Sequence, residues 1–345
     1  MKVLMIANPN STSQTNELFR RFVPLLREVP GLQLLSRFTH HPGHAEEMCA
    51  GLTRADVDVV LAVGGDGTVN EVVNGLLGPV GEEAVDAKTL PAVAVVPTGS
   101  ANVFARALGF PAEPVAAAQL LCDLLRGDYR RSICLGTWED RWFAVNAGFG
   151  IDAEVIARVD RARDKGFAAT PLRYLRVSAQ AWIRAQRTPP RVNVTAHDAG
   201  GETIHLSDLP LLLASNTNPW TFLGPVPVVT NPRNSFDKGL SLFGLSDLRG
   251  LRGVASVAYL IGIGHQLWFE EWIKQGTLQF DDASEVELVC REPQRFQADG
   301  EFEGELTRVH LSSVMDALEV FAPVESTPPG QRSLLETLRD LVRIS

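Results

Sequence analysis

The sequence predicts two domains: an α/β domain with a parallel sheet, followed by an all-β domain built as an antiparallel β-sandwich. The 345 residues, 45% of them apolar, suffice for two domains of ordinary size, each with its own core. The first third of the chain alternates strand-like apolar runs with helical patterns, which favours a parallel sheet covered by helices. After Asp128 short apolar strands alternate with Asn, Gly, Pro and Asp turns, which is typical of a sandwich.

The first domain is expected to cover residues 1–130. Its strands are predicted at residues 3–7, 32–38, 57–63 and 92–96. Its helices are predicted near residues 16–28, near 43–53, from 70 onward and over 114–127. A last helix at 331–345 spaces Leu334, Leu338 and Leu341 on one apolar face, and we expect it to return to this domain.

The second domain is expected over residues 131–330. Its strands are predicted at residues 141–147, 192–196, 211–215, 240–245, 278–280, 286–290, 309–311 and 317–321. Two helices, near residues 170–186 and near 253–275, interrupt these strands.

Charge and composition exclude several classes of function. The chain has 32 Lys and Arg against 41 Asp and Glu, a net charge of −9, which argues against nucleic acid as a partner. The longest apolar run, 254–263, falls short of the ~20 residues that a membrane-spanning helix needs. The N-terminus is too quickly polar for a secretory signal, and the four cysteines indicate neither a zinc site nor a disulfide framework. We therefore expect a cytoplasmic protein.

A glycine-rich loop is the most informative local feature. The buried strand that ends at Val63 leads into Gly64-Gly65-Asp66-Gly67-Thr68 and then directly into a helix. Glycines let the backbone approach a ligand closely, and a helix start offers unpaired N–H groups to an anion. The loop therefore suits a triphosphate, with Thr68 as a hydroxyl donor, although a plain tight turn is the alternative. Asp66 is either a partner of nucleotide-bound magnesium or a helix cap.

A second strand-to-helix turn, residues 97–106, is predicted at the same edge of the sheet. Ligands of parallel sheets bind at the carboxyl ends of the strands, so the two loops should converge on one crevice. Ser100 is either a phosphate donor or a cap, and Arg106 either neutralises phosphate or is solvated.

The motifs together resemble the diacylglycerol kinase catalytic family, which includes bacterial lipid kinases, sphingosine kinases and ceramide kinases. They are G-G-D-G-T-x-N-E-V-V-N-G-L, P-T-G-S-A-N-x-F-A-R and, in the second domain, Gln297-Ala298-Asp299-Gly300-Glu301. The first element alone is shared with NAD kinases and phosphofructokinases. The resemblance implies a Rossmann-like nucleotide-binding domain, a β-sandwich that takes the lipid, and a last helix that returns to the first domain.

The resemblance also implies which residues lie at ATP. Thr39 matches the family's T-x-x-x-G-H-A element, and in the opening N-P-x-S loop Thr12 replaces the family's glycine. The implied ATP-binding residues are Asn8, Pro9, Ser11, Thr39, Gly64, Gly65, Asp66, Gly67, Thr68, Asn70, Glu71, Gly99, Ser100, Asn102 and Arg106.

The family's D-G-E element implies catalytic carboxylates at Asp299 and Glu301, with Asp66 as a third. In an extended stretch, carboxylates at i and i+2 would share one face; one of them would accept the proton of an attacking hydroxyl. A polar β-turn is the alternative. The resemblance implies metal ligands at Asp66 and Asp237, although Lys238 interrupts the family's D-G turn and Cys134 stands where many relatives have Asp.

The expected function is ATP- and Mg²⁺-dependent phosphorylation of a lipid hydroxyl, with diacylglycerol as substrate and phosphatidic acid as product. The alternatives are a kinase of sphingoid bases or other lipid alcohols, a kinase of a soluble substrate such as NAD, and a non-catalytic lipid- or nucleotide-binding regulatory protein. Residues 158–191 carry nine basic against two acidic side chains, either as a membrane-facing surface or as a solvated helix face. We expect a lipid substrate at the inner face of the membrane; the oligomeric state, a homodimer included, is open.

Overall fold

Two structural units make up the chain in a computed structural model, which describes residues 1–9, 16–81, 86–149, 191–246, 255 and 276–323. The N-terminal unit holds Met1–Ala144 and the segment that begins at Val314. The C-terminal unit holds Val145–Ser313. The fold class expected from the sequence is confirmed, because the N-terminal unit is a mixed α/β structure and the C-terminal unit is antiparallel and mostly strands.

A parallel sheet forms the centre of the N-terminal unit. Its strand order is β2 (Gln33–Phe38), β1 (Lys2–Ala7), β3 (Val59–Gly64) and β4 (Ala92–Pro97). Strands β3 and β4 are buried along their whole length, which explains why they read as unbroken apolar runs. In register, Ala7 lies opposite both Phe38 and Val63, and Gly64 lies opposite Pro97, so the four strands end at one edge.

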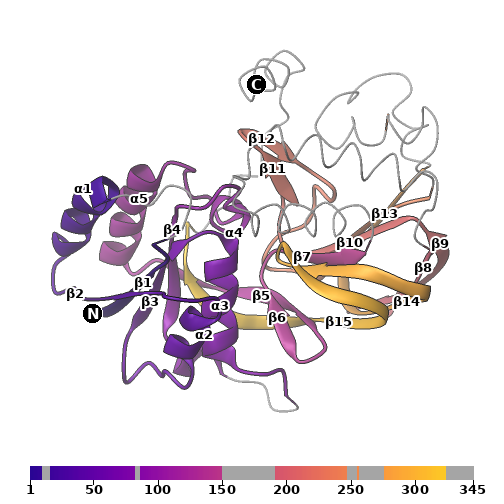
Figure 1. The fold of residues 1–345 in the computed structure, drawn as a ribbon, viewed down its shortest axis with the longest axis horizontal. Helices are drawn as coiled ribbons and strands as arrows, with labels where there is room; N and C mark the ends of the chain where they lie inside the picture. The colour runs from indigo at the N-terminus through magenta and orange to yellow at the C-terminus, as the bar shows by residue number, and fades with distance from the viewer. Residues whose placement is uncertain (10–15, 82–85, 150–190, 247–254, 256–275, 324–345) are drawn as a thin grey trace. The chain divides into compact units, whose positions relative to one another are not determined.

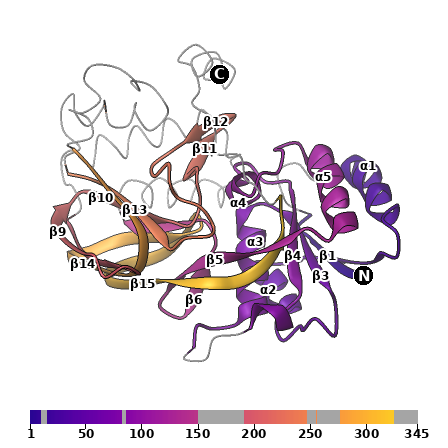
Figure 2. The ribbon, with the colours of Figure 1, turned by 180° about the vertical axis from the view of Figure 1, so that it is seen from behind.

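Helices cover both faces of this sheet. Helices α1 (Asn16–Arg27) and α5 (Pro114–Gly127) pack together on one side, and α2 (His44–Cys49) and α3 (Asp66–Leu77) on the other (Figures 1 and 2). The short helices η1 (Ala87–Thr89) and α4 (Val103–Ala107) flank β4 in the sequence. Gly75 allows α2 and α3 to approach closely, since a Cβ at this position would collide with the carbonyl of Glu46.

The hairpin of β5 (Arg130–Trp138) and β6 (Arg141–Phe143) also belongs to the N-terminal unit. It is tied to α2 by Arg141, whose two terminal nitrogens donate to Glu46 at 2.8 and 2.9 Å. In the described residues the units therefore divide between Ala144 and Val145, after this hairpin. The domain limits expected from the sequence, with a boundary near residue 130, stay a prediction for the chain as a whole.

Antiparallel strands build the C-terminal unit. Its strands are β7 (Asn146–Phe149), β8 (Val192–Asp198), β9 (Thr203–Leu209), β10 (Leu211–Ser215), β11 (Thr221–Leu223), β12 (Val226–Val228), β13 (Leu240–Leu245), β14 (Thr277–Ala298) and β15 (Glu301–Phe321). Strands β7, β10, β13 and β14 pair antiparallel to their neighbours, and β14 turns back directly into β15.

Strands β14 and β15 correct one expectation. The sequence predicted two short strands in each of these regions, whereas each region forms one strand of more than 20 residues. Along much of β14 buried and partly exposed residues alternate, so its polar side chains occupy one face and do not interrupt the strand. Residues of β15 from Val314 onward belong to the N-terminal unit, where Val320 pairs in parallel with Val93 of β4.

Several expectations lie outside the described residues. These are the helices near 170–186, 253–275 and 331–345, and all but the last residue of the basic segment 158–191. Among the helices in the described part of the chain, none combines the length and apolar character needed to cross a bilayer.

Candidate active site

Backbone hydrogen bonds gather the expected phosphate-binding residues at the carboxyl edge of the parallel sheet. The Asn8 N–H donates to Val63 O at 3.2 Å, and the Thr39 N–H donates to Ala7 O at 3.0 Å. One strand further along, the Thr98 N–H donates to Gly64 O at 2.9 Å. Ligands bind at this edge in parallel α/β sheets. Pro9 follows there as an exposed turn residue, whereas Ser11 lies outside the described residues.

The two glycine loops touch each other through their backbones. A Cβ on Gly99 would lie 2.6 Å from the Gly65 Cα, and a Cβ on Gly65 would lie 3.2 Å from the Gly99 Cα. A Cβ on Gly64 would collide with the side chain of Thr68, which is buried in the first turn of α3 beside Gly67. Gly65 and Gly99 are therefore required because two chain segments approach each other closely. The N-terminus of α3 lies at their junction.

Asp66 joins the same two loops through its side chain. Its carboxylate oxygens accept the N–H groups of Val103 at 3.0 Å and Phe104 at 2.9 Å, at the start of α4. Burial raises the pKa of the Asp66 carboxyl, while these hydrogen bonds and the charge of Arg106 oppose that rise. The sequence left two roles open for Asp66, a magnesium partner or a helix cap. The contacts show that Asp66 caps a helix, and that this helix is α4 instead of α3. The magnesium and catalytic roles of Asp66 stay predictions.

Asn102 shapes the second loop from within. It has a left-handed backbone with φ 50°, its Oδ1 accepts the Gly99 N–H at 2.8 Å, and its Nδ2 donates to Gly99 O at 2.9 Å. Ser100 is exposed at the tip of this loop, and Arg106 Nη1 donates to Ala101 O at 3.4 Å. Ser100 is thus accessible, and its contact with phosphate stays a prediction, whereas the Asn102 side chain is bonded within the loop itself.

The side chains of Asn70 and Glu71 hold neighbouring elements. Glu71 accepts the Gly43 N–H at 2.9 Å and the Ala45 N–H at 3.0 Å, at the start of α2. Asn70 Nδ2 donates to the carbonyl of Trp142 in β6 at 3.1 Å. Their implied contact with ATP stays a prediction, and the observed role of both side chains is to fix the surroundings of α3.

Asn74 is a site-supporting residue that the sequence reasoning missed. Buried on α3, it accepts the Trp142 N–H at 3.0 Å through Oδ1 and donates to Trp142 O at 3.0 Å through Nδ2. The available signal was the repeat of asparagine at i and i+4 in N-E-V-V-N, which places both amides on one face of the helix.

The D-G-E element forms a tight turn. Asp299 and Gly300 both have positive φ, 48° and 83°, and connect β14 to β15 with Ala298 opposite Glu301. A two-residue hairpin loop with two positive φ values is the type I′ turn that Asp-Gly favours. The expectation of an extended stretch with both carboxylates on one face is therefore wrong, because the chain reverses between them, and the β-turn alternative is confirmed.

Asp299 is buried and held by the start of β7. Its Oδ1 accepts the N–H groups of Val145 at 2.7 Å and Asn146 at 3.1 Å, and its own N–H donates to Asn146 O at 2.8 Å. The fully buried Gln297 completes the arrangement: its Nε2 donates to Asn146 Oδ1 at 2.7 Å and its Oε1 accepts the Gly300 N–H at 3.1 Å. No sequence signal marked Asn146. Glu301, in contrast, is exposed.

Two candidate positions remain, Asp237 and Cys134. Asp237 is exposed in the loop before β13, where its N–H donates to Ser235 Oγ at 3.4 Å, so its metal role stays a prediction. Cys134 is buried in β5 with its Sγ 3.3 Å from the Met315 Sδ, which gives that position no carboxylate function.

These features define a class: a Rossmann-like α/β fold with glycine loops at the carboxyl edge of its sheet, followed by an antiparallel β region. Residues 2–130 match the family model of the diacylglycerol kinase catalytic domain. Through this segment the chain is similar to the diacylglycerol kinase catalytic domain.

Curated relatives share sequence with parts of this chain, and solved structures share its fold. A probable YegS-like lipid kinase of Xanthomonas campestris is 36% identical over 163 residues, which are 45% of this chain and 49% of the relative. This chain thus spans about half the length of that relative. A diacylglycerol kinase of Staphylococcus carnosus is 24% identical, and that match covers 92% of this chain and 94% of the relative. A crystal structure of a putative diacylglycerol kinase from Bacillus anthracis superposes with a TM-score of 0.68 at 21% identity, covering 94% of this chain and 98% of that one; this likeness concerns the fold.

Proposed function

We propose that the chain is an ATP- and Mg²⁺-dependent lipid kinase that transfers the γ-phosphoryl group to the hydroxyl of diacylglycerol, giving phosphatidic acid. The observation that carries this proposal is the junction of the two glycine loops, in which Gly65 and Gly99 meet at the carboxyl edge of the sheet, within the segment that matches the diacylglycerol kinase family model. The names of two relatives, a probable lipid kinase and a diacylglycerol kinase, support the choice of a lipid acceptor.

The residues at the junction fit a nucleotide phosphate. The N-terminus of α3 presents backbone N–H groups, and the absence of a Cβ at Gly65 and Gly99 lets the main chain of the second loop lie directly beside this helix start. ATP would supply the γ-phosphoryl group. Each oxygen of the Asp66 carboxylate accepts one N–H group of α4, so a magnesium ligand at Asp66 would have to use the remaining lone pairs of these oxygens. The contribution of Asp66 is to hold the two loops in a fixed geometry, which is a large part of catalysis in phosphoryl transfer.

The two carboxylates of the D-G-E turn differ in their surroundings, and we assign them different roles. Asp299 is buried and its Oδ1 accepts two backbone N–H groups, so we assign it to positioning of the turn. Glu301 is exposed at the first residue of β15, and we assign it the acceptance of the proton from the lipid hydroxyl. A positioned general base of this kind contributes about 10²–10⁴-fold to a rate.

The test is transfer of label from γ-labelled ATP to a panel of dioleoylglycerol, sphingosine and ceramide in mixed micelles. We expect phosphatidate from wild type, and a loss of at least about 100-fold with Glu301→Gln, because the proton acceptor is removed. Glu303→Gln is the matched control, since Glu303 is an exposed glutamate on the same strand. Full activity of Glu301→Gln, or no lipid product from wild type, would contradict the proposal.

Membrane attachment belongs to the same proposal. A lipid kinase must reach its substrate, and the nine basic residues of 158–191 suit an anionic membrane surface at the cytoplasmic side, at about 1 kcal/mol for each basic side chain near it. We expect co-sedimentation with phosphatidylglycerol vesicles that is lost at high salt and in a multiple Arg→Gln variant of this segment. Binding that does not respond to salt would contradict this attachment.

A further inference from the structure

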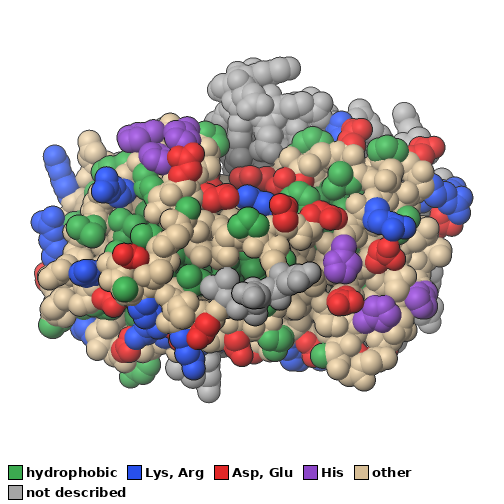
Figure 3. Space-filling model, turned by 90° about the horizontal axis from the view of Figure 1, so that it is seen from below, with side chains coloured by type: hydrophobic (Ala, Val, Ile, Leu, Met, Phe, Trp, Pro, Cys, Tyr) green, Lys and Arg blue, Asp and Glu red, His purple; other side chains and the backbone are tan. Residues whose placement is uncertain are grey.

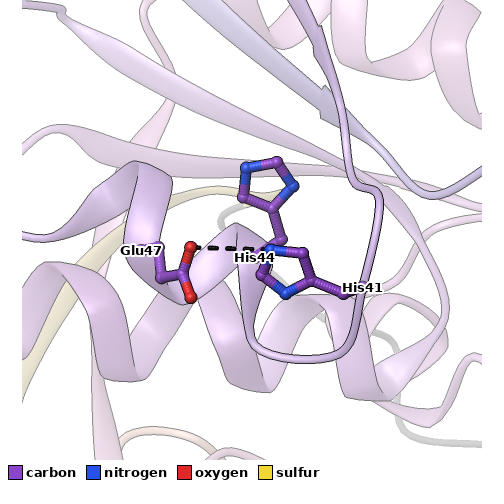
Figure 4. A group of neighbouring side chains, drawn as sticks. All are labelled: His41, His44 and Glu47. Atoms are coloured by element: carbon purple, nitrogen blue, oxygen red, sulfur yellow. Dashed lines mark ion pairs between the residues drawn. The ribbon is translucent and has the colours of Figure 1, made fainter.

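Three ligand-type side chains gather at the loop between β2 and α2. His41, His44 and Glu47 each offer one nitrogen or carboxylate oxygen, and these atoms all lie within 4.8 Å of one another (Figure 4). His41 and Glu47 are exposed and His44 is half-buried, and the histidines of the N-terminal unit form a patch on its surface (Figure 3). The proposed transfer reaction uses none of these side chains.

The backbone that carries this cluster is fixed from inside the protein. At one end of the loop, Thr39 is buried and its N–H donates to Ala7 O at 3.0 Å. At the other end, the Glu71 carboxylate of α3 accepts the N–H groups of Gly43 and Ala45 at 2.9 and 3.0 Å. The three side chains therefore project from an anchored segment and from the helix that follows it.

The ring of His41 is oriented as a metal ligand would be. Its Nδ1 lies 3.0 Å from Pro42 O, so a proton on Nδ1 leaves Nε2 with a lone pair, and Nε2 lies 3.7 Å from Glu47 Oε2. Histidines that bind metals usually donate their second ring N–H to a carbonyl or carboxylate in this way. The His41 and His44 rings stack at 4.5 Å with an angle of 13° between their planes.

Coordination by His44 has a specific consequence for the loop. Its Nδ1 accepts the His40 N–H at 3.1 Å, so the neutral ring carries its proton on Nε2. A metal ligated by either nitrogen of His44 therefore replaces this hydrogen bond, and the exposed His40 N–H turns to water. The three side chains must also rotate to converge on one ion, because metal–ligand distances near 2.0–2.2 Å place ligands about 3–3.5 Å apart, whereas these ligand atoms lie within 4.8 Å of one another.

We propose that His41, His44 and Glu47 form a binding site for a divalent transition metal, for which Zn²⁺ is the probe. Two imidazoles and one carboxylate are a ligand set typical of zinc, with water in the fourth position. Mg²⁺ prefers oxygen ligands in octahedral geometry, so this site is chemically distinct from the magnesium that accompanies ATP.

The test is equilibrium dialysis of the full chain against Zn²⁺ in a large excess of Mg²⁺ and without nucleotide, together with visible spectra of the Co²⁺-loaded protein. We expect one Zn²⁺ per chain at this site and Co²⁺ bands of a nitrogen-ligated ion. His41→Ala and His44→Ala should each weaken Zn²⁺ binding at least about tenfold, while thermal unfolding without metal stays close to wild type, because His41 is exposed and the half-buried His44 gives up one hydrogen bond from the exposed His40 N–H.

Two controls separate this site from general histidine binding. His40→Ala removes a histidine of the same loop that is not a proposed ligand. The double variant His197→Ala, His205→Ala removes exposed histidines of β8 and β9. Both should bind Zn²⁺ as wild type does. Wild-type affinity in His41→Ala and His44→Ala, or loss of binding in either control, would overturn the proposed ligand set.

Discussion

Gly99→Ala is expected to force the two phosphate loops apart. The new Cβ would lie 2.6 Å from the Gly65 Cα and 2.9 Å from Asn102 Oδ1, whereas carbon atoms in contact sit about 3.5–4.0 Å apart. One loop must therefore move by roughly 1 Å, and overpacking of this kind costs about 1–3 kcal/mol of stability. A displacement of ~1 Å at a catalytic site lowers the rate by as much as about 100-fold.

The chain offers a graded series with which to measure this effect. In Gly65→Ala the Cβ is 3.2 Å from the Gly99 Cα, so we expect a smaller loss. Gly81→Ala is the matched control, because Gly81 is exposed and a Cβ there meets nothing within 4 Å. Thermal unfolding and ATP titration of the purified variants should rank Gly81→Ala closest to wild type, then Gly65→Ala, then Gly99→Ala. Equal ATP affinity in Gly99→Ala and Gly81→Ala would refute the idea that loop contact shapes the nucleotide site.

Three further predictions concern the supports of the site. Glu71→Ala removes the acceptor of two N–H groups at the start of α2 and should lower the free energy of unfolding by about 0.5–2 kcal/mol in a urea titration; no change would contradict its capping role. Asn74→Ala leaves the buried Trp142 N–H without its acceptor and should cost about 1–3 kcal/mol in the same measurement, whereas a neutral result would show that the bond to β6 is dispensable. Burial, and secondarily the charge of Glu71, raises the pKa of the Cys49 thiol from 9.0 to about 12. Because the folded state then keeps a proton that the unfolded state loses, stability should fall above pH 9.0 by roughly 1.4 kcal/mol per pH unit, and Cys49→Ala should flatten that slope; parallel slopes would contradict it.

The parallel sheet and its ligand edge could be predicted because their signal is local. Buried strands such as β3 read as unbroken apolar runs, and strands in parallel register end together. The glycine loop could be predicted for the same reason, because a strand, three glycines and a helix follow one another in the sequence without interruption.

The partners of the polar side chains could not be predicted, because they lie far away in the sequence. Asp66 bonds to residues 37 and 38 positions later, and Gln297 bonds to Asn146 over a separation of 151. Spacing indicates which residues share a face, and only tertiary packing decides which helix start a carboxylate caps. At Asp299, in contrast, the local sequence held the answer. Asp-Gly is a recognised turn signal, and the structure has a turn there instead of the expected extended stretch.

The measurement that tests the central proposal most directly is competition between two acceptors for label from γ-labelled ATP. Wild type is given dioleoylglycerol in micelles and NAD together, and the products are separated and counted. The proposed function predicts that phosphate enters the lipid and that NAD stays unlabelled. Labelled NADP, or ATP binding with no labelled product from either acceptor, would contradict the assignment as a lipid kinase.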